Sequence, residues 1–168
     1  MTTFQSNARP RPRAARSLKQ RAVALLARRE YSRAELSRRL GSAGAAPADV
    51  DAVLDELEAA GLLSDARFSA ALVQQKRVSH GRRAIAQALR DKGVDAERAA
   101  DALSALDGDD EFARAHVLWA RRFGAAPRDD RERARQIRFL VARGYATSVA
   151  FRLVRGSNRA ADVDEASN

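Results

Sequence analysis

Cysteine is absent from this 168-residue sequence, and histidine occurs only twice, at His80 and His116. Without cysteine the chain has no disulfide framework and no thiolate ligand for a metal. The two histidines are far apart in the sequence, which is unfavourable for a histidine-rich metal cluster. We therefore expect no metal site, no other cofactor and no disulfide-stabilised fold.

Aromatic residues are also scarce and make up only 5% of the chain. Strands favour aromatic and β-branched residues. This sequence is instead dominated by alanine, leucine, arginine and glutamate, which favour helices. The composition therefore predicts an all-α fold and argues against β and α/β folds.

Long apolar runs are missing as well. The longest strongly apolar stretch, residues 22–27, is far shorter than the roughly 20 residues that cross a bilayer. Residues 1–16 are polar, carry arginine and proline, and lack the apolar segment of a secretory signal. These features predict a soluble, cytoplasmic protein with no membrane partner.

Positive charge is what the sequence has in excess. Its 31 lysines and arginines stand against 22 aspartates and glutamates, so the net charge is +9. Residues 1–16 hold four arginines and no acid, and residues 128–155 hold eight arginines against three acids, whereas residues 17–63 balance to zero. This distribution predicts a polyanionic partner, or an assembly that contains a polyanion.

Helical periodicity recurs three times along the chain. Apolar residues at i, i+4, i+7 and i+8 predict a first helix over about 17–30. Ser32 and Glu35 have the spacing of a capping box, which predicts the start of a second helix, and Pro47 suits the first turn of a third. The same order of helix starts and glycine ends then returns twice.

Three glycines make the repeat explicit, because Gly44, Gly93 and Gly144 are separated by 49 and 51 residues. Apolar residues stand at the same four offsets from each glycine, and a fixed period of this kind is typical of repeat proteins. We predict an all-α, elongated, curved tandem array of three three-helix repeats. Its predicted parts are a disordered basic arm over 1–16, repeats over 17–63, 64–107 and 108–156, and a disordered tail over 157–168.

Three segments of the chain resemble the signature of the RecX regulatory proteins. They are residues 29–36 (REYSRAEL), residues 61–68 (GLLSDARF), and residues 122–124 (RFG) followed by 138–145 (RFLVARGY). The resemblance covers about 17–156 and keeps the order of the family's segments. The second repeat departs from the pattern, since Val78-Ser79-His80-Gly81 stands where a bulky aromatic residue is often found before the middle helix.

The resemblance implies a modulator of the RecA recombinase, built as a three-fold repeat of three-helix units. Such proteins bind the RecA–single-stranded DNA filament along its helical groove, and most restrain its ATPase, strand exchange and coprotease activity. For this chain the resemblance implies a monomeric regulator in homologous recombination, DNA repair and the SOS response. Its expected partners are the RecA filament and the single-stranded DNA within it, with free DNA bound only weakly.

No catalytic constellation emerges from the residues themselves. A glycine-rich phosphate loop followed by lysine and serine or threonine is absent from the sequence, which argues against nucleotide hydrolysis. The paired acids at 109–111 and 129–130 stand at predicted helix starts, where negative charge stabilises a helix. His116 falls on an apolar face and is predicted to be a core or partly buried residue, and Trp119 and Phe123 are predicted to be core residues. We therefore expect a protein that is not an enzyme.

A second hypothesis is a helical, sequence-specific DNA-binding transcription factor. Residues 32–40 and 47–60 resemble the two helices of a helix-turn-helix motif, with 47–60 as the recognition helix. That segment is strongly acidic, however, which is unfavourable for insertion into a major groove.

Arginines of the three middle helices are our candidates for contact with the filament or DNA. If equivalent helices line one side of the array, these arginines form a positive stripe. The alternative is a solvated face with ion pairs inside each helix, such as Glu35 with Arg39 and Glu132 with Arg135 or Gln136. The candidates are Arg33, Arg38, Arg39, Arg82, Arg83, Arg131, Arg135 and Arg138.

Overall fold

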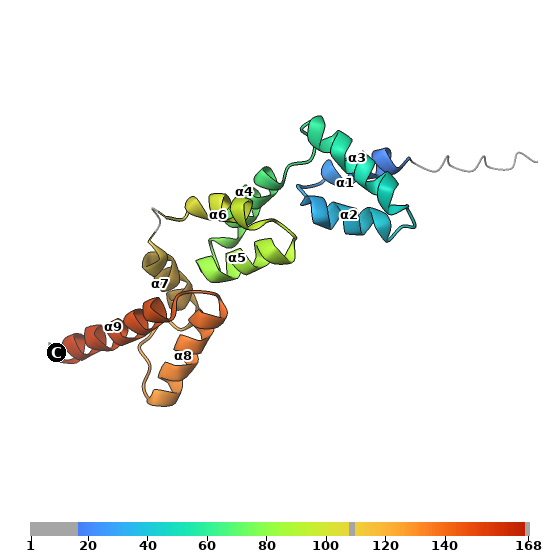
Figure 1. Ribbon diagram of the computed structural model, residues 1–168. Coiled ribbons are helices and arrows are strands. Elements are labelled where there is room, and N and C mark those ends of the chain that lie inside the picture. The colour runs from blue at the N-terminus through green and yellow to red at the C-terminus, as the bar shows by residue number, and fades with distance from the viewer. Residues whose placement is uncertain (1–16, 108–109, 167–168) are drawn as a thin grey trace, which may run out of the picture.

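The computed structural model describes residues 17–107 and 110–166, and their regular structure is entirely α-helical (Figure 1). The first unit consists of α1 (Leu18–Leu26), α2 (Arg33–Gly41) and α3 (Pro47–Ala59). The second consists of α4 (Asp65–Lys76), α5 (Arg82–Asp91) and α6 (Ala96–Ser104). The third consists of α7 (Glu111–Arg122), α8 (Asp130–Ala142) and α9 (Thr147–Ala166). The predicted all-α array of three three-helix repeats is confirmed, while the predicted arm over 1–16 lies outside the described residues.

Each unit buries an apolar core of its own. The middle helices contribute Leu36 and Leu40 to the first core, Ile85 and Leu89 to the second, and Leu140 to the third, all fully buried. Burying one such side chain contributes about 1.5–3 kcal/mol. The apolar periodicity of the sequence therefore corresponds to three small cores rather than one large one.

Helix α9 extends beyond the predicted end of the third repeat. The sequence pattern ended this repeat at residue 156 and assigned residues 157–168 to a disordered tail, whereas α9 continues to Ala166. Gly156 lies inside the helix, and no proline follows it in the sequence. Because a single glycine only weakens a helix by about 1 kcal/mol, it does not end this one.

The connection between α1 and α2 also differs from the prediction. Helix α1 ends at Leu26 rather than near residue 30, and the following residues turn the chain so that Tyr31 enters the first core. The Arg29 guanidinium carbon lies 3.6 Å from the centroid of the Tyr31 ring. This cation–π contact holds the turn against the core it leads into.

The predicted capping box at the start of α2 is only half formed. Ser32 Oγ accepts a hydrogen bond from the backbone N–H of Glu35 at 3.1 Å, as expected of an N-cap. The Glu35 carboxylate does not return to Ser32, however, because it accepts hydrogen bonds from Arg29 and from Lys92 of the second unit. A contact between units has replaced the local one.

The first two units meet end to end through their middle helices. Ser32, the N-cap of α2, donates its hydroxyl to the backbone C=O of Lys92, the C-cap of α5, at 2.6 Å. Beside this bond Gly93 lies against Ala34, so closely that a Cβ on Gly93 would be 2.5 Å from the Ala34 Cβ. The positive end of one helix dipole therefore abuts the negative end of the next, which is a favourable arrangement.

The second and third units meet through a similar end-to-end joint between their middle helices. Gly81, the N-cap of α5, donates its backbone N–H to the C=O of Arg143, the C-cap of α8, at 2.9 Å. A Cβ on Gly81 would lie 2.4 Å from the Gly144 carbonyl oxygen, and one on Gly144 would lie 2.4 Å from the Ala84 Cβ. This close approach explains why glycine stands here where the first unit has serine.

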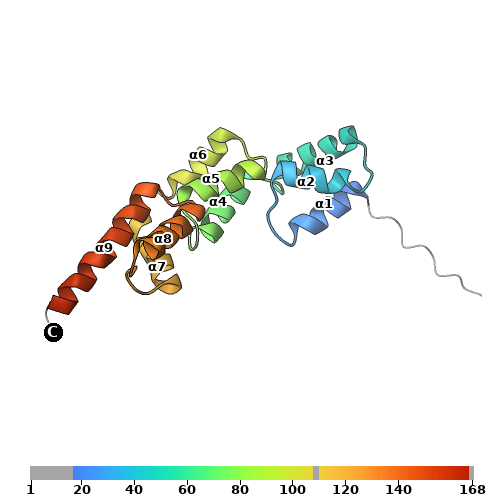
Figure 2. The same ribbon diagram turned by 90° about the horizontal axis from the view of Figure 1, so that it is seen from below.

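A carboxylate from the start of each following unit completes the joint. Asp65, the first residue of α4, accepts from the backbone N–H of Arg33 at 2.7 Å. Glu111, the first residue of α7, accepts from the backbone N–H of Arg82 at 3.4 Å. Both amides belong to the first turn of a middle helix, which has no acceptor of its own for them. As Figures 1 and 2 show, α2, α5 and α8 follow one another along the array.

Replacing Gly144 by alanine should destabilise the protein more than replacing Gly44. Both glycines have a positive φ, +83° and +84°, but only at Gly144 would the new Cβ meet another unit. The φ penalty is about 1–2 kcal/mol at either position, and overpacking adds about 1–3 kcal/mol at Gly144. Urea titrations followed by far-UV circular dichroism measure the two losses, and equal losses would contradict the close contact between units.

Candidate nucleic-acid interface

Two of the eight candidate arginines form ion pairs within their own three-helix unit. Arg33 forms ion pairs with Asp55 and Glu58 of α3, each at 2.8 Å. Arg82 donates to the backbone C=O of Leu103 in α6 at 2.9 Å and pairs with the carboxylate of Asp107. Each arginine therefore ties a middle helix to the third helix of its unit, which leaves it less charge to offer a partner.

The other six candidates are exposed on the surface. Among the side chains that the structure describes, in residues 17–107 and 110–157, they form no ion pair with a carboxylate. These six residues are Arg38, Arg39, Arg83, Arg131, Arg135 and Arg138.

The pairs that would have neutralised Arg39 and Arg135 within their helices are not formed. Glu35 turns instead to Arg29 and Lys92, with N–O distances of 2.9 and 2.8 Å. Glu132 accepts from the backbone N–H of Arg128 at 3.0 Å, before the start of α8. The prediction of a self-neutralised face is therefore wrong for these two pairs.

Three candidates share one face of α8. Arg131, Arg135 and Arg138 are spaced i, i+4 and i+7, which places them on one side of a helix, and all three are exposed. The buried side of α8 carries Gln136 and Leu140. We call the surface formed by Arg131, Arg135 and Arg138 the α8 face.

Phe123 joins the α8 face to the end of α7. The guanidinium carbons of Arg122 and Arg135 lie 5.5 and 5.7 Å from the centroid of its ring, within the range of cation–π contacts. The ring is half-buried and packs edge-to-face against Phe139 at 5.3 Å. Sequence reasoning assigned Phe123 to the core and missed Arg122, although the two are adjacent in the sequence.

The two other residues predicted to be core differ in their outcome. Trp119 is buried, as predicted, and its indole N–H donates to Gln136 Oε1 at 2.8 Å. Because its ring is enclosed, it offers no surface for base stacking. The prediction that His116 is a core or partly buried residue is wrong, because α7 packs through Ala115 and Trp119 and leaves the His116 side chain exposed.

The six exposed candidates do not form one continuous stripe. The end-to-end joints place the N-terminus of α2 against the second unit, so Arg38 and Arg39 in its last turn lie at the far end of the first unit. Arg83 lies at the joint between α5 and α8, where its backbone N–H donates to Gly144. The structure thus separates the cations of α2 from those of the α8 face.

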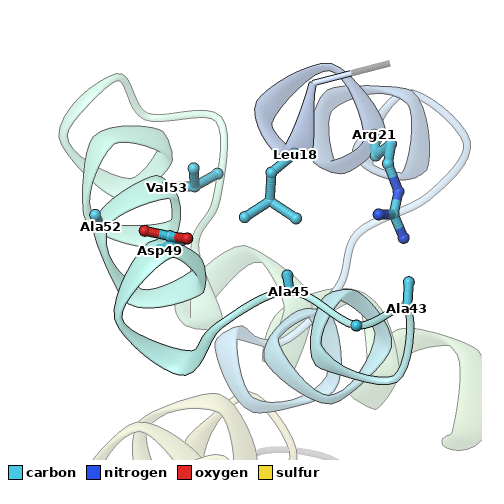
Figure 3. Close-up of a pocket in the computed structure, with 8 residues that line it drawn as sticks. Leu18, Arg21, Ala43, Ala45, Asp49, Ala52 and Val53 are labelled. Carbon is cyan, nitrogen blue, oxygen red and sulfur yellow. The ribbon is translucent and has the colours of Figure 1, made fainter. Parts of the chain in front are cut away.

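Two hollows flank α1 in the first unit, and Arg21 borders both. Figure 3 shows the first of them, where Leu18 and Val53 face each other between α1 and α3 and Asp49 projects from α3. The second lies between α1 and the end of α2. Its lining consists of Arg21, Ala24, Leu25, Arg28, Arg39 and Ser42.

Neither a metal cluster nor a membrane-spanning helix is found in the part of the chain that the structure describes. There, no three side chains of histidine, aspartate or glutamate gather as metal ligands. None of the helices described has the length and apolar character needed to cross a bilayer.

Comparison with known proteins identifies relatives along almost the whole chain. Family models described as RecX, first, second and third three-helix domain, match residues 19–57, 64–103 and 109–154. The regulatory protein RecX of Leptothrix cholodnii is 46% identical over 148 residues, which cover 88% of this chain and 94% of that protein. The regulatory protein RecX of Chromobacterium violaceum is 42% identical over 141 residues, which cover 84% and 91%.

A solved structure shows the same fold at much lower sequence similarity. The crystal structure of RecX from Lactobacillus salivarius aligns with a TM-score of 0.70 at 17% identity, covering 84% of this chain and 94% of that one. The end-to-end arrangement of three-helix units is thus compatible with very different sequences.

Replacing Glu35 by glutamine should lower the free energy of unfolding at neutral pH, and the decrease should be smaller in acid. The hydrogen bond from Arg29, followed by that from Lys92, lowers the pKa of Glu35 from 4.5 to about 2. A lowered pKa stabilises the folded state above the unfolded pKa, and this stabilisation is lost as the pH falls through about 2. Because Arg29 and Lys92 are partly exposed, we expect a loss of about 1–2 kcal/mol at pH 7.

Urea denaturation at pH 7, 4 and 2.5 measures this loss and its decrease in acid. Glu56→Gln is the matched control, because Glu56 forms a 2.8 Å pair with Lys19 in which both side chains are more than half exposed. We expect a smaller loss for the control at pH 7. If both variants lose the same stability, Glu35 has no special part in the joint.

Proposed function

The chain belongs to the RecX family, and on this premise we propose that it binds the RecA–single-stranded DNA filament and restrains RecA. In this proposal the chain is a cytoplasmic, monomeric regulator without enzymatic activity. It limits RecA ATPase, strand exchange and coprotease activity in homologous recombination, DNA repair and the SOS response. Occupancy of the filament groove blocks protomer movement, protomer addition or access by a second duplex.

The end-to-end array of three units is the observation that supports this proposal best. The joints Ser32–Lys92 and Gly81–Arg143 hold the middle helices in succession, so the molecule is elongated (Figure 1). An elongated molecule can contact several positions on a polymer at once. Linked contacts of this kind raise overall affinity without requiring any one strong site.

Exposed arginines supply the second line of support. The α8 face, together with Arg122 near Phe123, presents guanidinium groups that form no ion pair within the described residues. Guanidinium groups bind phosphate and carboxylate oxygens bidentately. This surface therefore suits DNA phosphates or an acidic protomer surface of the filament.

The transcription-factor hypothesis receives less support from the same structure. Its recognition helix would be α3, whose carboxylates Asp55 and Glu58 are engaged with Arg33. Asp49 and Asp51 of α3 are exposed as well, and they keep the exposed side of this helix acidic. We therefore propose RecA regulation as the function.

The decisive test is the effect of the purified chain on RecA. DNA-dependent ATPase activity and strand exchange should both fall when the chain is added at substoichiometric ratios. If neither activity changes at any ratio, the proposed function is refuted. Preferential binding to one duplex sequence over others would instead favour the transcription factor.

Charge reversal on the α8 face should weaken binding to the filament and flatten its salt dependence. The variant carries Arg131→Glu, Arg135→Glu and Arg138→Glu, and its affinity is measured by fluorescence anisotropy on labelled filaments between 50 and about 300 mM salt. For single-stranded DNA, the slope of log affinity against log salt should fall in magnitude by about 0.7 for each phosphate contact that is lost.

The matched control has the same change in charge at exposed positions outside this face. It carries Lys19→Glu, Arg98→Glu and Arg155→Glu, of which Lys19 and Arg98 form exposed surface pairs of little energetic weight. If both triple variants behave alike, net charge rather than the α8 face governs binding.

A further inference from the structure

Three arginines border the hollow between α1 and the end of α2. Arg21 comes from α1, Arg28 from the turn that follows α1, and Arg39 from the last turn of α2. None of the three forms an ion pair with a carboxylate of residues 17–107 and 110–157, whose side chains the structure describes. No acidic side chain lines this hollow, although Arg21 also borders the neighbouring hollow that Asp49 lines. We call the hollow bordered by all three arginines the arginine hollow.

The acidic residues of the first unit lie elsewhere. Glu56 of α3 pairs with Lys19, and Asp55 and Glu58 of α3 pair with Arg33. The unit has no net charge over residues 17–63, but five of its seven acids lie on α3 and none lines the arginine hollow. A segregated charge of this kind creates a local field that net charge does not reveal.

The arrangement of the arginines suits an extended anion better than a compact one. Arg21 lies on α1, Arg28 lies two residues beyond the end of α1, and Arg39 lies on α2, so the three guanidinium groups come from separate segments around the hollow. Ala24 and Leu25 also line the hollow and give it an apolar floor. A strand of nucleic acid has this alternation, with regularly spaced phosphates and less polar sugars and bases between them.

We propose that the arginine hollow binds the phosphodiester backbone of single-stranded DNA. This inference deepens the proposed function and rests on it, because the RecA filament would supply the strand. The first unit, which holds the hollow, and the third unit, which holds the α8 face, lie at opposite ends of the array (Figure 1). The chain therefore holds nucleic acid at two separated points, and each contact raises the effective concentration of the other.

Binding of the full-length chain to a fluorescent oligothymidylate tests the proposal through its salt dependence. In Arg21→Gln/Arg28→Gln the slope of log affinity against log salt should fall in magnitude by about 1.4, or about 0.7 per lost phosphate contact. The single variant Arg39→Gln, on a different helix, should lower it by about 0.7. The control Lys19→Gln/Arg155→Gln loses the same charge from outside the hollow, and its slope should stay close to that of the unchanged chain.

Each outcome of this experiment decides for or against the site. Equal slopes for the hollow variants and the control overturn the proposal. The proposal is also overturned if the chain binds ATP or inorganic phosphate saturably, the hollow variants abolish that binding, and the oligothymidylate slope stays unchanged. The hollow would then be a nucleotide or phosphate site. Weaker binding to RecA filaments with an unchanged oligothymidylate slope also overturns the proposal, in favour of a protein contact.

A parallel RecA ATPase assay separates this inference from the proposed function. If the chain without substitutions inhibits RecA, but the hollow variants bind oligothymidylate with the same salt-dependence slope as that chain, only the proposed DNA-binding role of the arginine hollow is refuted. If the unchanged chain has no effect on RecA, the proposed function fails, whatever the slopes are.

Discussion

The first turn of an α-helix has backbone N–H groups that the helix itself cannot satisfy, and this architecture depends on how they are paired. For α2 and α5 the following unit supplies the partners: a C-cap carbonyl meets the N-cap residue, and the carboxylate of Asp65 or Glu111 accepts from the first helical amide. Each middle helix is thus completed by its neighbour. Small cores that share little apolar surface are held in order by polar groups at helix ends.

This way of joining units explains where the charge lies. Because α2, α5 and α8 meet end to end, the last turn of α2 and the start of α8 lie at opposite ends of the succession. Arg33 and Arg82, close to the joints, are engaged within their units, whereas the arginine hollow and the α8 face are remote from them. The molecule is therefore organised to present cations at two separated places along its length.

The candidate interface could be predicted only in part from the sequence. Helical spacing was enough to group Arg131, Arg135 and Arg138, because three residues at i, i+4 and i+7 share a face whatever surrounds them. It did not predict the ion pairs of Arg33, whose partners lie on another helix. Nor did it predict the pairing of Glu35 with Lys92, which belongs to the next unit. Ion pairs between residues distant in sequence depend on packing, and periodicity carries no information about them.

The sequence by itself determined the helical class, the three-fold repeat and the apolar side of each middle helix, because composition and period act locally. Only the tertiary structure decided how the units join, which arginines remain unpaired and where they gather. The same contrast holds at the glycines: their period marks helix ends, but the need for Gly81 arises from its approach to Gly144. Contacts between helix ends of different units have no signature in a linear pattern, since each partner satisfies its local rules without the other.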